Sequence, residues 1–440
     1  MSRKIQEGSF IYFFTKFFVD LSLRSAYRKY QVEGAENIPT DGSVIWASNH
    51  TNALMDPLVL LAATSGQKVF MARADIFQKK KAVKWLSFLK IMPIYRIRDG
   101  FESVKRNTET IAQATEILLD GVPLVIYPEA THRPKHSLLK LSKGIFHITS
   151  SVYENSPADK PVYIQPIGIE YGDYFRFRST VLVRFGKPID VSEYIRSHGD
   201  IPVPVQMLEL KNILSDRLAG LIAFVPDDES YDATWEYAKL KAGNPEYSRK
   251  VISELESDGN RLPGLMRRQA VDRYAIGQVS EMKKTDPEGT AELLRKVEDL
   301  RVWRIQNGVS VRTIAKSCTF AGALLKAVLA LVGLPYYIFC AVVASIFWIP
   351  TLLILRGIKD EAFYNTARFG VRFGISIIAV PLWAVLYFCF LPSWPLALGA
   401  LVLSLPSIRY LYDYGDFFRR TASDLRWVLR RRKAPDYSFL

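Results

Sequence analysis

The stretch Asn49-His50-Thr51-Asn52-Ala53-Leu54-Met55-Asp56 decides how the first half of this chain is interpreted. It follows the apolar run Val44-Ile45-Trp46-Ala47, which predicts a buried strand. Asp56 precedes Pro57, and this pair predicts the start of a helix, because aspartate is a favoured N-cap and proline a favoured first helical residue. His50 is then expected in a strand-to-helix turn, a common position for catalytic side chains in α/β proteins.

A histidine beside a carboxylate can be held in one tautomer and act as a general base. Taken alone, His50 could equally be an ordinary loop residue and Asp56 a simple cap. Further segments downstream favour the catalytic interpretation. They are Ile91-Met92-Pro93-Ile94-Tyr95-Arg96, Tyr127-Pro128-Glu129-Ala130-Thr131-His132-Arg133 and Ile164-Gln165-Pro166-Ile167-Gly168.

Together with His50 and Asp56, these segments resemble, in order, the four motifs of the glycerolipid acyltransferases. The resemblance covers roughly residues 30–190. Five residues separate His50 from Asp56, where the family usually has four, and this longer spacing resembles the fungal-type glycerol-3-phosphate acyltransferase branch. The third motif departs from the family pattern, because Ala130 replaces the usual glycine and His132 the usual arginine.

The resemblance implies roles for individual residues. His50 would be the general base and Asp56 would orient its imidazole, while Arg96 would bind the acceptor phosphate. Glu129 would position the acceptor or hold the local turn, and both interpretations stay open. The substrate-binding set would be completed by Thr131, which is retained, and by His132 or Arg133, either of which could contact phosphate.

The expected chemistry is direct transfer of an acyl group from acyl-CoA or acyl carrier protein to a hydroxyl, with no further cofactor. The sequence contains no Gly-x-Ser-x-Gly elbow, and its cysteines lie far from the motifs, so the acceptor itself would be the nucleophile. His132 and His136 are four residues apart, but Pro134 lies between them and no metal site is expected. His147 and His198 are interpreted as a structural and a loop residue.

Two long apolar blocks follow in the second half of the chain. Residues 319–355 contain one charge, Lys326, and residues 373–408 contain none, which predicts membrane segments. Gly333-Leu334-Pro335 and Pro392-Ser393-Trp394-Pro395 would divide the blocks into two hairpins. Basic residues between and after the blocks predict that those parts lie in the cytosol. The three cysteines form no disulfide framework, which predicts a catalytic domain facing the cytosol as well.

The sequence thus predicts an α/β fold with an acyltransferase-type mixed sheet flanked by helices, a helical linker domain and C-terminal transmembrane helices. We expect an interfacial amphipathic helix over 1–28, the catalytic domain over 29–200, the linker over 201–315, the apolar hairpins over 316–410 and a basic tail over 411–440. The net charge of +14 is interpreted as membrane contact, with no nucleic-acid partner.

The predicted function is a step of phospholipid synthesis in the inner (cytoplasmic) or an ER-type membrane, with membrane lipids, an acyl thioester and a phosphorylated glycerol as partners. The acceptor could be glycerol-3-phosphate, dihydroxyacetone phosphate or 1-acyl-glycerol-3-phosphate. An acyltransferase for another lyso-lipid, such as a lyso-aminolipid, and a non-catalytic lipid-binding membrane protein are the alternatives. The oligomeric state is left open.

Overall fold

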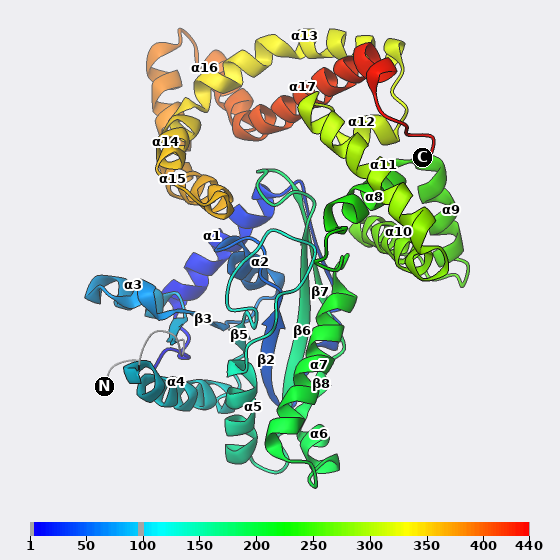
Figure 1. Ribbon diagram of the computed structural model, residues 1–440. Helices are drawn as coiled ribbons and strands as arrows, with labels where there is room; N and C mark the ends of the chain where they lie inside the picture. The colour runs from blue at the N-terminus through cyan, green and yellow to red at the C-terminus, as the bar shows by residue number, and fades with distance from the viewer. Residues whose placement is uncertain (1–3, 96–100, 440) are drawn as a thin grey trace. The chain divides into compact units, whose positions relative to one another are not determined.

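The computed structural model describes residues 4–95 and 101–439 of the chain, which forms two compact units, 1–222 and 223–440 (Figure 1). The first unit combines a β-sheet with helices, and the second is helical in its described part. Arg96 lies outside the described residues.

The first unit is built on a mixed sheet of eight described strands. They are β1 (Lys29–Glu33), β2 (Ser43–Ser48), β3 (Val69–Arg73), β4 (Ile91–Ile94), β5 (Leu124–Ile126), β6 (Val162–Tyr171), β7 (Thr180–Phe185) and β8 (Ile189–Asp190). Their order is β1-β7-β6-β2-β5-β3-β4, with β8 also paired to β6. Strands β2 to β6 are mutually parallel, and β7 and β8 run antiparallel to β6. The predicted mixed sheet is confirmed.

Helices pack around this sheet and complete its core. They are α1 (Phe10–Ala26), α2 (Met55–Ala63), α3 (Lys80–Phe88), α4 (Phe101–Leu119), α5 (Gly144–Asn155), α6 (Val191–Ser197) and α7 (Val203–Leu221). Every residue of β2 is buried, as expected for a central strand covered on both faces. Leu210, Leu214 and Leu218 of α7 belong to the same core cluster as Ile45. Helix α7 therefore belongs with the sheet, so this unit extends beyond residue 200, the predicted boundary of the catalytic domain.

The second unit begins with a group of packed helices. They are α8 (Tyr231–Gly243), α9 (Pro245–Leu255), α10 (Leu265–Thr285), α11 (Pro287–Gln306) and α12 (Val311–Ala315). Helix α8 is central, since it packs against the other four. Glu236 of α8 is buried and pairs with Arg304 of α11.

The apolar part of the chain forms α13 (Phe320–Val343), α14 (Ser345–Arg356), α15 (Tyr364–Phe390), α16 (Trp394–Ser404) and α17 (Ser407–Arg430). Among the described residues, two helical segments are long and apolar enough to cross a membrane, Phe320–Val343 and Glu361–Phe390, and a bent pair formed by α16 and α17 could make a third. The second block breaks between Phe390 and Trp394, as its prolines predict. The first block differs from expectation, because α13 continues through Pro335 and ends only at Val343.

Candidate active site

The candidate site lies where three neighbouring parallel strands end. His50 follows β2, Glu129 follows β5, and Tyr171 is the last residue of β6. Because β2 pairs in parallel with both β5 and β6, their carboxyl ends share one edge of the sheet. This edge is the usual location of ligand sites in open α/β sheets.

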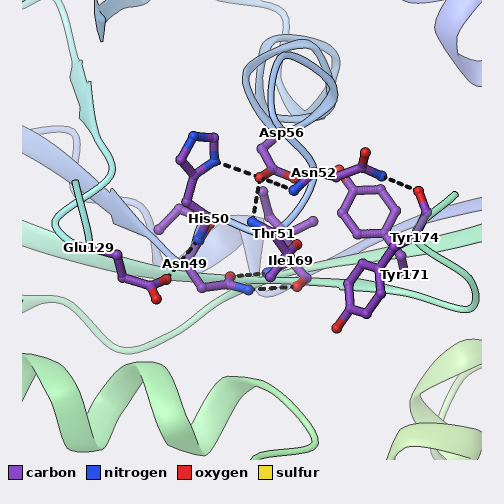
Figure 2. Close-up of polar contacts among 10 residues, drawn as sticks. Asn49, His50, Thr51, Asn52, Asp56, Glu129, Ile169, Tyr171 and Tyr174 are labelled. Atoms are coloured by element: carbon purple, nitrogen blue, oxygen red, sulfur yellow. Dashed lines mark hydrogen bonds and ion pairs between the residues drawn. The ribbon is translucent and has the colours of Figure 1, made fainter. Parts of the chain in front are cut away.

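The imidazole of His50 is paired with the carboxylate of Asp56 (Figure 2). The two side chains meet at 2.7 Å between His50 Nδ1 and Asp56 Oδ2. Oδ2 also accepts the backbone N–H groups of Thr51 and Asn52, at 2.7 and 2.8 Å. Oδ1 accepts the hydroxyl of Tyr171 at 2.7 Å. Asp56 is fully buried, so these four donors replace the water that an ionised carboxylate requires.

The local backbone explains how the longer spacing still brings the two side chains together. Helix α2 begins at Met55, so Asp56 lies inside its first turn, and the prediction that Asp56 is the N-cap is wrong. The carboxylate points back to the preceding loop instead of capping its own helix. Ala53 has a positive φ of 40°, and this left-handed residue reverses the chain between His50 and α2.

The loop is anchored to β6 by asparagine side chains. Asn49 is buried, and its amide exchanges two hydrogen bonds with the backbone of Ile169, at 2.7 and 2.9 Å. Asn52 donates from its side chain to the carbonyl of Tyr174 at 2.8 Å. His50 therefore lies in a loop whose two sides are fixed to neighbouring backbone (Figure 2).

Glu129 holds this loop from the other side. One carboxylate oxygen accepts the backbone N–H of His50 at 2.9 Å, and the other accepts the N–H of Leu139 at 2.7 Å. The side chain is buried, and burial raises the pKa of Glu129, while the two backbone donors oppose that rise. Of the two roles predicted for Glu129, this geometry favours holding the turn.

Aromatic rings border the imidazole. The Tyr127 ring stacks on His50 with centroids 4.3 Å apart, and the His132 ring meets His50 edge-on at 5.6 Å. The His50 side chain nevertheless keeps 17% of its surface exposed. The ring is thus oriented by its neighbours and remains accessible to a small reactant.

The rest of the third motif lies in the same loop. Arg133 donates its backbone N–H to the carbonyl of His50 at 3.1 Å and its guanidinium to Ser137 at 2.7 Å. Thr131 is exposed. Ala130 has a φ of +58°, a left-handed conformation that glycine adopts with least strain, which accounts for the glycine of the family pattern. His132 is the member of this group whose ring contacts His50.

Tyr171 is a site residue that the sequence interpretation missed. Burial and the charge of Asp56 raise the pKa of Tyr171 well above its ordinary value, so its hydroxyl stays protonated and donates to the carboxylate. The signal was available, since Tyr171 lies three residues after the fourth motif. The strand β6 contains that motif and ends at Tyr171.

Comparison with known proteins gives two findings. The acyltransferase family model matches residues 29–170. A crystal structure of the 1-acyl-sn-glycerophosphate (LPA) acyltransferase PlsC from Thermotoga maritima is similar at 21% identity and a TM-score of 0.33, covering 46% of this chain and 77% of that chain. The search of curated proteins finds no significant match. His50, Asp56, Glu129 and His132 all lie within the segment that the acyltransferase family model matches.

Proposed function

We propose that this protein is a membrane-bound acyltransferase that transfers a fatty acyl group from acyl-CoA or acyl carrier protein to glycerol-3-phosphate or 1-acyl-glycerol-3-phosphate. The observation that carries the proposal is the 2.7 Å contact between His50 Nδ1 and Asp56 Oδ2, inside the segment that matches the acyltransferase family. Because Asp56 engages Nδ1, Nε2 is the nitrogen that receives the proton of the acceptor hydroxyl.

The chemistry follows from this assignment. The acceptor hydroxyl gives its proton to His50 Nε2 while its oxygen attacks the thioester carbonyl, which forms the new C–O bond. The C–S bond then breaks, and the leaving thiolate takes the proton from the imidazolium. Asp56 stabilises the imidazolium between these steps, and Glu129 keeps the backbone of His50 in place.

The acceptor phosphate would be bound by basic side chains. We assign this role to Arg96, with His132 and Arg133, and Thr131 would line the same subsite. The contact between the His132 and His50 rings supports a phosphate position within reach of the base. The five-residue spacing between His50 and Asp56 supports the fungal-type branch, in which glycerol-3-phosphate would be the acceptor.

Membrane attachment would involve both units, with the catalytic side in the cytosol. The two candidate spans are the strongest support. Helix α1 also exposes large aromatic side chains, with Phe10, Phe14 and Phe17 between 57 and 84% accessible. Such a face is typical of helices that lie in the bilayer interface, and it fits the interfacial helix predicted over 1–28.

The test is acyl transfer by the purified protein in detergent, with labelled glycerol-3-phosphate, lysophosphatidate and a lyso-aminolipid, and with both thioester donors. The proposal expects product from one phosphorylated acceptor and its loss in His50→Ala. His147→Ala is the matched control, because His147 is exposed on α5. If His50→Ala still transfers the acyl group, His50 is not the general base. Product from the lyso-aminolipid alone would change the acceptor, and no product at all would favour the non-catalytic alternative.

A further inference from the structure

A groove of about 350 Å³ lies in the second unit, between α17 and the loop that joins α11 to α12. Arg419, Ala422, Ser423 and Arg426 of α17 line one side. Their spacing of three, four and seven residues puts them on one face of the helix, with the arginines about 10 Å apart along its axis. The small side chains between the arginines leave the floor of this α17 groove open.

The loop on the opposite side fixes one of the arginines. Arg426 donates to the carbonyl of Gly308 at 3.2 Å. Gly308 has a φ of +61°, and a Cβ atom there would lie 2.5 Å from Arg426 Nη1. The backbone conformation therefore favours glycine at this position, and a side chain there would displace the guanidinium of Arg426.

The α17 groove lies beside the beginning of a candidate membrane span. Helices α13 and α17 run antiparallel, because Lys326 pairs with Asp424 near one end while Tyr410 donates to the carbonyl of Gly333 farther along. Residues 419–426 thus lie next to the first turns of Phe320–Val343. Phe418, which also lines the groove, is 56% exposed. A molecule bound in this groove would place its polar groups at the arginines and its apolar part against Phe418 and the neighbouring apolar helix.

The surrounding charge is positive. Residues 405–440 contain eight basic and four acidic side chains, so a positive excess remains. Two of the acidic side chains are buried and paired: Asp416 with Arg420 and, at 3.9 Å, with Arg419, and Asp424 with Lys326 of α13. The charge of Arg312 is the largest cause that lowers the pKa of Lys316, and burial and two further cations, Lys326 and Arg420, add to it. Several positive groups therefore lie close together at this end of the unit. An anion is the complementary ligand.

From these observations we propose that the α17 groove binds the phosphate of an anionic phospholipid headgroup, with Arg419 and Arg426 on the phosphate and the acyl chains beside α13. A guanidinium suits phosphate because its fork of N–H donors matches the phosphate oxygens. Basic pockets at the ends of membrane helices bind anionic headgroups in this way. The inference does not depend on acyl transfer at His50.

The experiment measures binding of fluorescent phosphatidylglycerol to the full-length protein in nonionic detergent, with phosphatidylcholine for comparison. We expect a preference for phosphatidylglycerol, and a loss of about 30-fold in affinity in the double variant Arg419→Gln/Arg426→Gln, at about 1 kcal/mol for each arginine. Arg431→Gln/Arg432→Gln removes the same charge outside the groove, and we expect less than a threefold change.

A second variant tests the site without altering charge. Ala422→Leu fills the floor of the groove, and we expect it to weaken phosphatidylglycerol binding while the melting temperature is kept. If Arg419→Gln/Arg426→Gln and Arg431→Gln/Arg432→Gln lose equal affinity for phosphatidylglycerol, the lipid is attracted to the basic tail as a whole, and the proposal is overturned. Equal affinity for phosphatidylcholine, an unaffected Ala422→Leu variant, or full displacement by millimolar inorganic phosphate would overturn it as well.

Discussion

Replacing Asp56 by asparagine tests the proposed catalytic pair most directly. The change keeps the size of the side chain and removes its negative charge. If the amide oxygen occupies the Oδ2 position, it can still accept from His50, Thr51 and Asn52, and the amide NH2 then faces the hydroxyl of Tyr171, which can rotate to accept. The loop geometry should therefore survive.

The expected cost lies in the charge that develops on His50 during the reaction. With the carboxylate 2.7 Å from Nδ1, the charge centres are about 4 Å apart, and their attraction is about 4 kcal/mol at an effective dielectric constant near 20. Losing it should lower kcat by about 10³. Weaker hydrogen bonds at a buried site should cost a further ~1–2 kcal/mol of folding stability.

The assay is kcat for acyl transfer at saturating substrates, with the circular dichroism spectrum and melting temperature as checks of folding. Asp41→Asn is the matched control, because Asp41 is exposed and lies before the amino end of β2, whereas the catalytic loop follows the carboxyl end of that strand. A folded Asp56→Asn protein that keeps more than a tenth of the wild-type kcat would refute the reasoning, since the carboxylate would then serve the loop and not the imidazolium.

Three further changes test other parts of the first unit. Tyr171→Phe removes one hydrogen-bond donor from Asp56, so the carboxylate should hold the imidazolium more strongly. The acid limb of the pH–rate profile should then move to higher pH, and an unchanged limb would show that Tyr171 does not act on the His50–Asp56 pair. Ala130→Gly relieves a left-handed alanine and should raise the unfolding free energy by about 0.5–1 kcal/mol in a denaturant titration, where a loss would contradict the strain argument. Burial lowers the pKa of Lys68 to about 7, so above that pH the folded protein has released a proton that the unfolded chain retains until about pH 10.5. Stability should then rise with pH between 7 and 10.5, and melting curves of Lys68→Met should lack this rise.

Local patterns were sufficient for much of the sheet. The strand predicted from Val44-Ile45-Trp46-Ala47 lies within β2, because continuous apolar residues specify a buried strand without reference to the rest of the chain. Strand β1 was not predicted. All five of its residues, Lys29–Glu33, are exposed or half-buried, so it lacks a clear apolar signal and is placed by its pairing with β7.

The position of the break in the first apolar block could not be read from proline alone. Proline in a helix frees a carbonyl in the preceding turn and normally favours a break. Here Pro335 lies inside α13, and two tyrosines of α17 supply donors nearby, Tyr414 to the carbonyl of Ala330 and Tyr410 to that of Gly333. Helix α13 thus packs here against a segment some 80 residues away, a tertiary contact that the local pattern around Pro335 does not reveal.

The contacts of the His50–Asp56 pair could likewise not be predicted in full from the local sequence. The family resemblance paired His50 with Asp56, but the local pattern Asp56–Pro57 also made Asp56 the cap of its helix, which is wrong. The structure gives its carboxylate a partner, Tyr171, 115 residues away, and turns it back over the loop through the left-handed Ala53. An extra residue between histidine and aspartate is thus accommodated by the turn. What the proposed chemistry requires is a buried carboxylate in the first turn of α2 that reaches His50 Nδ1, and several loop conformations can deliver it at different spacings.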